Sequence, residues 1–456
     1  MDAAKARSGQ RVCVVGAGPC GLTALKNLSA AGIRDLVCYD EGQAIGGNWV
    51  FDERPDRHSV YDVTHLISSK RLSEFEDYPF PDAYPDYPSH RQIRSYFEDY
   101  AAHFGLLQFV RLATRVLRAT LLPDQRWVIS SIGPQGAREE TFDYLVVCTG
   151  HHREPFTPEY PGRFSGEVLH SSEYKRPDIF KDKRVLVVGG GNSACDISVD
   201  LARVARKTCI SMRRGYHILP KLMFGRPSDL LYARLRNGFP LPRWLLQLLG
   251  SAAIRLSVGP LEKYGLQKPK GKLFETHPTL SSDILNALRN GTVLSRVGID
   301  RLEENRVRFS DGTSEEFDVI IWATGYRISF PFLDKSVVTW EEAESVPLYL
   351  KMMHGLVPSV FFIGLFQPIG CIWRLADHQA RIAALQIKGL LERPDDIEAR
   401  IEREVSSPHW RFDKVSRHAV EVDYHDFRHE LLKEIGSASL SSAGPQPAGP
   451  SADAAA

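Results

Sequence analysis

Glycine residues recur in a pattern that can bind the phosphates of a nucleotide. The first pattern, Gly16-Ala-Gly18-Pro-Cys-Gly21, follows an apolar run that begins at Arg11 and precedes leucines at helical spacing. In such a strand–turn–helix, the first glycine makes the tight turn, the second admits a pyrophosphate and the third allows close packing. The helix start adds unpaired N–H groups and a partial positive charge. The pattern predicts a dinucleotide site formed by Gly16, Gly18, Pro19, Cys20 and Gly21.

A second strand–turn–helix pattern follows the apolar run Arg184–Val188. Its third position is Ala194, which this motif accepts in place of glycine. We therefore predict a second dinucleotide site, formed by Gly189, Gly191, Asn192 and Ser193.

The residue after the next strand differs between the two patterns. Asp40 stands 24 residues after Gly16, and Arg213 stands 24 residues after Gly189. An acid suits a free ribose hydroxyl, whereas an arginine suits a 2′-phosphate. The second site is thus predicted to bind NADPH through Arg213, with Arg214 beside it.

A further pair of similar segments extends the similarity between the two halves of the chain. Phe142–Gly150 resembles Phe317–Gly325, and their final glycines lie 175 residues apart, against 173 for the two glycine turns. The chain is therefore predicted to be an α/β protein with two Rossmann-like domains. Two dinucleotide sites indicate a flavin and a nicotinamide, so the residues alone predict an NADPH-dependent flavoprotein.

The composition restricts the classes of protein to which the chain can belong. The chain has 456 residues, a net charge of +1 and 25% charged residues, which favours a globular protein of two or three domains and gives no global attraction for nucleic acid. The seven cysteines include no Cys-x-x-Cys pair, which argues against a disulfide reductase and favours a reducing, cytoplasmic location. No metal-ligand spacing is present.

Membrane association is not expected from the sequence. The N-terminus has no secretory pattern. The most apolar stretch, Trp244–Leu256, is too short to span a bilayer and contains Gln247 and Arg255. We expect no transmembrane segment and interpret this stretch as a packed helix, with a membrane-surface or substrate-entry segment as the alternative.

The segment between the two predicted sites contains a motif that resembles one of a known family. Phe164-Ser-Gly166-Glu-Val-Leu-His170-Ser-Ser-Glu-Tyr174 is similar to the fingerprint of flavin-containing monooxygenases. Other pieces of that family's pattern, within residues 10–395, stand in the expected order: Gly46–Trp49, Asp77–Pro85, Gly191–Asp196, Ala323–Tyr326 and Asp377–Arg381. Tyr174-Lys175 replaces the Trp-Pro of the larger Baeyer–Villiger enzymes.

The resemblance implies an activity with FAD and NADPH as cofactors. NADPH reduces FAD, oxygen adds at the flavin C4a to give a (hydro)peroxyflavin, and one oxygen atom passes to a small soft nucleophile. That nucleophile is an N- or S-containing or an aromatic, indole-like molecule. Baeyer–Villiger oxygenation of ketones and an uncoupled NADPH oxidase that releases peroxide remain alternatives. A homodimer is common among relatives of this kind.

The resemblance also assigns further residues, with the chemistry taking place at the flavin rather than on a catalytic side chain. His170 is expected to be a hinge residue joining the two domains. Flavin and nicotinamide contacts are implied for Gly47, Asn48, Trp49, Leu66, Ile67, Ser68 and Gln379.

Ile67 departs from the family pattern, in which an asparagine commonly stands at this position. Isoleucine has no side-chain donor or acceptor, so the substitution puts a long-lived oxygenated flavin in doubt and favours an apolar or aromatic substrate. Thr64, His65 or Ser68 would be the polar replacements.

The implied architecture is a discontinuous FAD domain interrupted by an NADPH domain. We expect the FAD domain to comprise residues 1–165 and 326–436, and the NADPH domain residues 166–325. Residues 437–456 are rich in small residues and proline and are expected to form a disordered tail.

Overall fold

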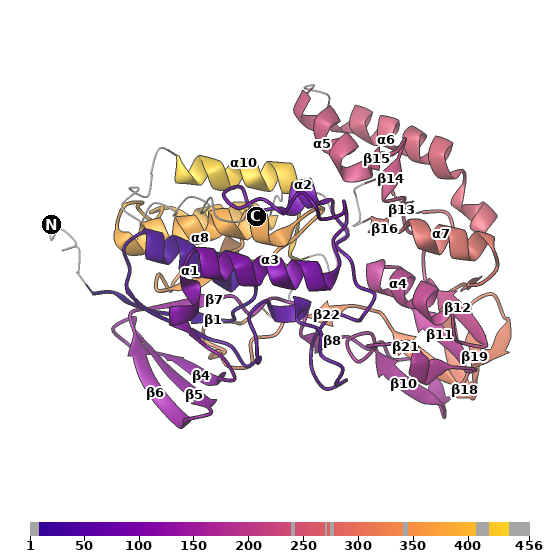
Figure 1. Ribbon diagram of the computed structural model, residues 1–456, viewed down its shortest axis with the longest axis horizontal. Helices are drawn as coiled ribbons and strands as arrows, with labels where there is room; N and C mark the ends of the chain where they lie inside the picture. Colours follow the sequence, from indigo (N-terminus) through magenta and orange to yellow (C-terminus); the bar gives the residue numbers. More distant parts are fainter. Residues whose placement is uncertain are drawn as a thin grey trace, which may run out of the picture.

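The fold was analysed in a computed structural model, which describes residues 9–238, 242–269, 271–273, 278–340, 345–406 and 419–436. The predicted tail, 437–456, lies outside these residues. Two separate sheets organise the molecule, one with a parallel centre and one parallel throughout, and Figure 1 shows them at its two ends.

The first sheet has seven strands in the order β23-β24-β25-β7-β1-β2-β3. Its centre is parallel, because β1 pairs with β2 and β7, and β7 pairs with β25. The strands are β1 (Arg11–Val15), β2 (Asp35–Tyr39), β3 (Val110–Arg111), β7 (Tyr144–Val147), β23 (Leu348–Tyr349), β24 (Met353–His354) and β25 (Val360–Phe362).

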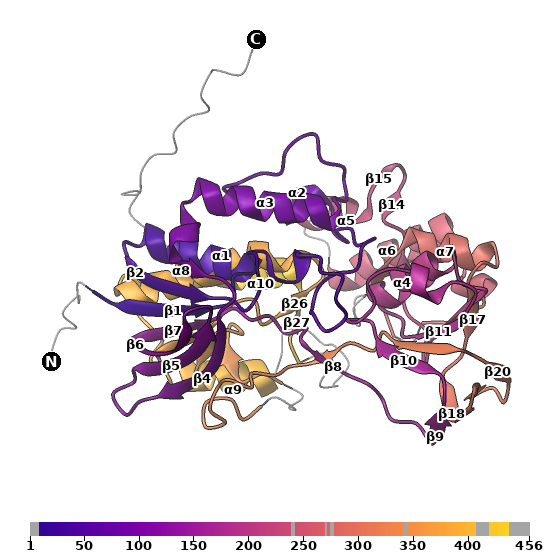
Figure 2. The ribbon, with the colours of Figure 1, turned by 60° about the horizontal axis from the view of Figure 1, so that its bottom comes forward.

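The first sheet is covered on both faces, as the apolar runs of its central strands require. Alternate residues of β1 point to opposite faces: Val12 and Val14 join one core, and Cys13 and Val15 join the other. The first core contains α1 (Pro19–Ala30), α3 (His90–His103), α8 (Ile372–Lys388) and α10 (Tyr424–Ile435), which lie together on one face of the sheet (Figure 2). The second contains the antiparallel sheet β4 (Arg115–Leu121), β5 (Trp127–Gly133) and β6 (Gly136–Phe142).

The second sheet has five parallel strands in the order β10-β21-β11-β12-β17. They are β10 (Glu167–His170), β11 (Arg184–Val188), β12 (Lys207–Ser211), β17 (Leu294–Arg296) and β21 (Val319–Trp322). One core packs against α4 (Asn192–Leu201) and α7 (Ser282–Arg289). The other packs against a small sheet of β9 (Gly162–Phe164), β18 (Ile299–Glu304), β19 (Arg306–Phe309) and β20 (Ser314–Glu316).

The topology is that of one unit inserted into another. Strands of the first sheet end at Val147 and resume at Leu348, and all strands of the second sheet lie between them. The predicted fold, two Rossmann-like domains with the second inserted into the first, is thus confirmed. The boundaries near residues 165 and 325 stay predictions.

Two helices form an arm above the second unit: α5 (Ser228–Gly238) and α6 (Arg243–Val258) (Figure 1). Among the described residues, one helical segment, Trp244–Tyr264, is long and apolar enough to cross a membrane by length and composition. Leu246 is buried, but Trp244 is 63% exposed and Leu256 is 84% exposed. The expectation of a packed helix is therefore wrong for the outer face of α6, because only its inner face meets the protein. The absence of a transmembrane segment stays a prediction.

Candidate functional site

The first glycine turn joins β1 to α1 in the geometry that a pyrophosphate requires. Gly16 has φ +103°, and a Cβ there would lie 2.6 Å from the carbonyl oxygen of Cys148. A Cβ on Gly21 would overlap the carbonyl oxygen of Gly16. Gly18 caps α1 without a side-chain hydrogen bond, and Pro19 and Cys20 open the helix. The helix start therefore offers backbone N–H groups with no side-chain acceptor.

Asp40 follows β2 and faces this turn. Its Oδ2 accepts a hydrogen bond from the N–H of Ala17 (2.6 Å), and its Oδ1 accepts one from Gly42 (2.7 Å). Burial raises the pKa of Asp40, while these two N–H groups oppose the shift. The buried hydroxyl of Thr149, which adjoins Gly16, has no hydrogen-bond partner among the described residues. The glycine cradle, the uncapped helix and this hydroxyl fit the adenosine diphosphate half of FAD.

The predicted flavin-side residues adjoin the same turn. A Cβ on Gly18 would lie 3.6 Å from the Cα of Gly47, so the turn and η1 (Gly47–Trp49) are in contact. Asn48 is exposed. The ring of Trp49 meets that of Trp373 edge to face, with centroids 5.8 Å apart. The fold thus places η1, which ends at Trp49, against the first glycine turn.

The segment around Ile67 is only partly available to a ligand. Leu66 is buried in the first core, and Ile67 is half-buried. The Oγ of Ser68 is 2.7 Å from that of Ser73, so this hydroxyl is engaged within the protein. Within the part of the chain that the structure describes, the buried hydroxyl of Thr64 has no hydrogen-bond partner. Of the three polar replacements considered for the family asparagine, Thr64 is therefore the one with an unused buried hydroxyl.

Gln379 is fully buried and engaged by the backbone. Its Oε1 accepts a hydrogen bond from the N–H of Gly364 (2.9 Å), and its Nε2 donates one to the carbonyl of Leu350 (2.9 Å). A Cβ on Gly364 would overlap the sulfur of Cys20. Gln379 therefore fixes a glycine that packs on the first turn. Its contact with the flavin ring stays a prediction.

The second glycine turn repeats this geometry with a more open face. Gly191 caps α4 without a side-chain hydrogen bond, at φ −84° and ψ −179°, against −70° and −179° at Gly18. A Cβ on Gly191 would meet nothing within 4 Å, whereas one on Gly189 would overlap the carbonyl oxygen of Ala323. The turn is thus packed from behind by the protein and open at its second glycine, which fits the approach of the NADPH pyrophosphate.

The side chains around the second turn have mixed roles. Asn192 Oδ1 accepts a hydrogen bond from the N–H of Leu280 (2.9 Å), so this side chain also fixes β16 (Thr279–Leu280). Arg213 is exposed after β12. The guanidinium of Arg214 lies 5.6 Å from the ring centroid of Tyr216, and that ring covers Gly190. Arg213 is therefore the better placed of the two arginines for a phosphate.

A carboxyl group lies within the same helix. Tyr61 donates a hydrogen bond to Oδ2 of Asp196 (2.9 Å) and also contacts the hydroxyl of Ser193. Desolvation raises the pKa of Asp196 to about 6. This link from the first unit to α4 was not visible in the sequence, because 135 residues separate its ends.

Two further links between the units were missed by sequence reasoning. Lys175 Nζ is buried and donates hydrogen bonds to the carbonyl of Arg57 (2.8 Å) and to Oγ of Ser59 (2.8 Å), and burial lowers its pKa to about 8. Asp229 of α5 accepts a hydrogen bond from the N–H of Ser69 (2.6 Å). Only the Tyr174-Lys175 dipeptide gave any signal for the first link.

His170 is hydrogen-bonded within the second unit, and its expected role as a hinge residue joining the two domains stays a prediction. One of its ring nitrogens lies 3.0 Å from the carbonyl oxygen of Gly325, and the other lies 3.0 Å from Oγ of Ser172. Desolvation lowers the pKa of His170, so the ring is neutral near pH 7. The residue thus connects β10 to the segment that leaves the second unit.

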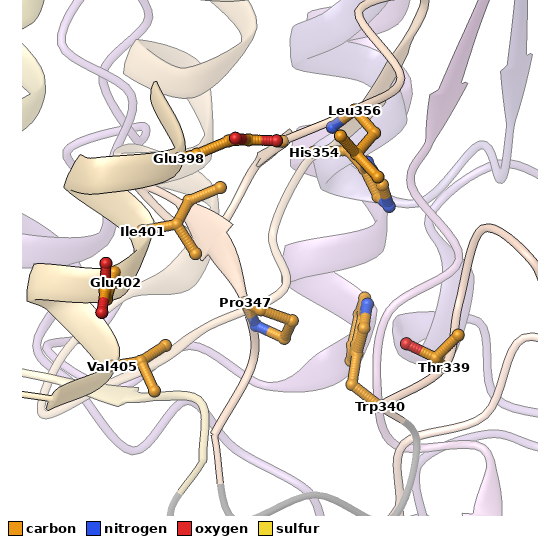
Figure 3. A pocket seen from close by; sticks show the side chains of 10 residues that line it. Thr339, Trp340, Pro347, His354, Leu356, Glu398, Ile401, Glu402 and Val405 are labelled. Carbon is orange, nitrogen blue, oxygen red and sulfur yellow. The ribbon is translucent and has the colours of Figure 1, made fainter. Parts of the chain in front are cut away.

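An apolar cavity of about 120 Å³, the interdomain chamber, lies between the arm and the first unit. Its walls come from α5, α6, Leu273, Pro278 and Leu280 on one side, and from Leu72, residues 369–371 and the start of α10 on the other. An open hollow of about 400 Å³ lies between α9 (Ile397–Ser406) on one side and residues 339–340, Pro347 and residues 354–356 on the other. Figure 3 shows Ile401 and Val405 facing Pro347 and Trp340 across it. This hollow contains none of the predicted site residues.

Known proteins similar to this chain are found along nearly its whole length. Residues 9–441 match the family described as "FMO-like: Flavin-binding monooxygenase-like". The chain is 34% identical to Flavin-containing monooxygenase 5 of Rattus norvegicus, covering 94% of this chain and 83% of that protein. It is also 34% identical, with the same coverage, to Dimethylaniline monooxygenase [N-oxide-forming] 2 of Mus musculus.

Solved structures show the same fold. S-allyl-L-cysteine S-oxygenase from Allium sativum matches with a TM-score of 0.69 and 24% identity, over 94% of this chain and 89% of that one. An ε-caprolactone-bound cyclohexanone monooxygenase matches with a TM-score of 0.70 and 18% identity, over 93% and 97%.

Proposed function

The chain belongs to the flavin-binding monooxygenase-like family, and from this premise we propose that it inserts one atom of O₂ into a small, soft nucleophile at the expense of NADPH. FAD and NADPH are its cofactors. The observation that carries the proposal is the pair of glycine turns on one chain, each ending in a helix start without a side-chain cap.

The protein's part in this chemistry is binding and placement. FAD supplies the reaction with oxygen when it is bound. We propose that the first turn and Asp40 hold its adenosine diphosphate half, and that Trp49 and residues 66–68 border its ring. The second turn holds the NADPH pyrophosphate, and Arg213 holds the 2′-phosphate. The links through Tyr61, Lys175 and Asp229 keep the two units in register.

The proposed substrate is neutral or weakly polar, with a sulfur, nitrogen or electron-rich aromatic centre. The apolar side chain at Ile67 and the mostly apolar interdomain chamber support this choice. A homodimer and a cytoplasmic location complete the proposal, and the seven unpaired cysteines support a reducing compartment.

The test is a mass balance with labelled oxygen. The flavin-loaded protein is mixed with NADPH, ¹⁸O₂ and methyl phenyl sulfide, and the sulfoxide, NADP⁺ and peroxide are measured. We expect one ¹⁸O-labelled sulfoxide for each NADPH oxidised, with the second oxygen atom leaving as water. Peroxide in place of sulfoxide would instead identify an NADPH oxidase. Ester or lactone from a ketone probe, without sulfoxide, would identify a Baeyer–Villiger enzyme.

A further inference from the structure

The interdomain strap, residues 57–63, belongs to the first part of the chain but packs into the second unit. Tyr61, near its middle, is 8% exposed and belongs to the core that packs against α4. Lys175 fastens the strap from the same side: its Nζ donates a hydrogen bond to the carbonyl of Arg57 (2.8 Å), and its carbonyl accepts one from the N–H of Asp62 (3.0 Å). One side of the strap is thus built into the second unit.

The other contacts of the strap are with the first unit. The N–H of Val60 donates a hydrogen bond to the carbonyl of Asn48 (2.8 Å), which lies in η1. The ring of His90, the first residue of α3, is buried, and its Nε2 lies 3.1 Å from the carbonyl oxygen of Asp62. The strap then continues into residues 64–68, the segment that includes Ile67. A displacement of the strap is therefore transmitted to both segments expected beside the flavin.

The hydroxyl of Tyr61 meets the start of α4. It donates a hydrogen bond to Oδ2 of Asp196 (2.9 Å) and also contacts the hydroxyl of Ser193. Ser193 belongs to the turn that is predicted to hold the NADPH pyrophosphate, and Asp196 lies three residues further along the same helix. Tyr61 thus connects this turn to the strap.

A second tyrosine makes the same kind of hydrogen bond one turn further along α4. Tyr174 donates to Oδ2 of Asp200 (2.7 Å), and its ring meets that of Tyr61 edge to face, with centroids 6.0 Å apart. Tyr174 and Asp200 both belong to the second unit, so their bond does not join the two units. Of these two tyrosine–aspartate bonds, that of Tyr61 is the one that can fix one unit against the other.

Hydride transfer depends on how the two cofactors are placed relative to each other. One hydride leaves NADPH, which becomes NADP⁺, and the flavin accepts that hydride and is reduced by two electrons. The reacting atoms must approach to about 3–3.5 Å, and a misplacement of about 1 Å can lower the rate about 100-fold. The expected NADPH contacts, the second turn and Arg213, lie within the second unit, whereas the placement of NADPH on the flavin depends on how the units are held.

We infer that Tyr61 is a positioning residue for hydride transfer: through Asp196 and Ser193 it holds the NADPH turn in a fixed place relative to the flavin-side segments. Tyr61 therefore acts on the rate at which bound NADPH reduces the flavin rather than on the affinity for NADPH. The inference rests on the proposed function for the presence of both cofactors.

Two tyrosine variants provide a matched test. Tyr61→Phe and Tyr174→Phe each keep the ring and leave a carboxylate of α4 without its phenol donor, so we expect similar decreases in melting temperature. The flavin-loaded, full-length proteins are mixed with NADPH without oxygen, and the limiting rate of flavin reduction is measured by stopped flow. We expect Tyr61→Phe to lower this rate about 10- to 100-fold and Tyr174→Phe to leave it unchanged. The dissociation constant of NADP⁺, measured by calorimetry, should stay within about threefold of the wild type in both.

Two further measurements separate positioning from a loss of stability. A nicotinamide placed against the oxidised flavin changes the flavin absorption spectrum without any turnover, so saturation with NADP⁺ should give a smaller difference spectrum in Tyr61→Phe than in wild type or Tyr174→Phe. Asp196→Asn keeps an oxygen that can accept the hydrogen bond of Tyr61, and we expect its limiting rate to stay within about threefold of the wild type. Asp196→Ala removes that oxygen and should behave as Tyr61→Phe. Flavin content per chain confirms that each variant is folded.

The outcomes decide the role of Tyr61. An unchanged limiting rate in Tyr61→Phe, or an equal loss in Tyr61→Phe and Tyr174→Phe, overturns positioning across the two units. A loss confined to the affinity for NADP⁺ overturns it as well, because Tyr61 would then act within the turn alone. Flavin that NADPH reduces at a rate dependent on Tyr61, without oxygenation of methyl phenyl sulfide, contradicts the proposed function and leaves the positioning role standing.

Discussion

The two glycine turns share one backbone geometry and differ in how the protein encloses them. At the first, the second glycine is covered by Gly47, and the acid after the next strand is hydrogen-bonded to the turn. At the second, Gly191 has open space around it and the arginine after the next strand is exposed. A cofactor that stays through every turnover suits the enclosed turn, whereas a co-substrate that must leave suits the open one. The same motif is thus adapted to retention or to exchange by what packs around it.

The third position of each turn offers the largest test of this comparison. Gly21→Ala would place a methyl group on the carbonyl oxygen of Gly16, whereas Ala194 already occupies the equivalent position. We expect Gly21→Ala to cost about 3 kcal/mol or more and to yield protein without flavin. The reciprocal Ala194→Gly should cost about 1 kcal/mol and retain flavin. Flavin absorbance per chain and the melting temperature measure both. A Gly21→Ala protein with one flavin per chain would show that the enclosure of the first turn is not needed.

The arginines after β12 provide the next test. Arg213→Gln removes a charged donor to the 2′-phosphate, so we expect the NADPH KM to rise about 10- to 100-fold with no change in the NADH KM. Arg214→Gln is the matched control, because the guanidinium of Arg214 lies over Tyr216. Initial steady-state rates of NADPH and NADH oxidation in air-saturated buffer give both constants. A larger loss in Arg214→Gln would reassign the phosphate contact to that residue.

Asp196 of α4 allows a test with a smaller expected effect, which is based on how the free energy of unfolding depends on pH. Its pKa of about 6 lies above the usual value of an unfolded aspartate, so the folded state binds the extra proton. This contribution to stability is present at low pH and is lost as the pH rises from about 4 to 6. We expect Asp196→Asn to raise the free energy of unfolding by about 1–2 kcal/mol at pH 7 and to have little effect at pH 4. Urea denaturation at the two pH values measures this difference. An equal change at both would mean that the carboxylate is not destabilising.

Sequence spacing predicted the parts of the molecule that are local. The turns at Gly16 and Gly189 each lie within about ten residues, so strand, turn and helix could be recognised together. The contacts that join the units could not be recognised, because Asp229 and Ser69 are 160 residues apart and no local pattern links them. The exposed outer face of α6 was mispredicted for the same reason, since burial depends on which neighbours reach a helix. The roles of Gln379 and Asn192 in fixing backbone were also hidden, because either amide could equally have faced a cofactor.

The smallest expected effect lies at Ile67, two residues before Ser69, whose N–H donates to Asp229 of the second unit. An amide there would supply a hydrogen bond beside the flavin that isoleucine lacks, worth about 0.5–1.5 kcal/mol, or about 2- to 12-fold in rate. We expect Ile67→Asn to lower the peroxide released per NADPH oxidised, measured with and without methyl phenyl sulfide. Ile67→Leu, which keeps the volume and adds no amide, should leave the ratio unchanged. Because the unpartnered hydroxyl of Thr64 lies nearby in the chain, Thr64→Val should raise the ratio if it already supplies the missing polar group. No change in any of the three variants would mean that this segment does not control how oxygen is used.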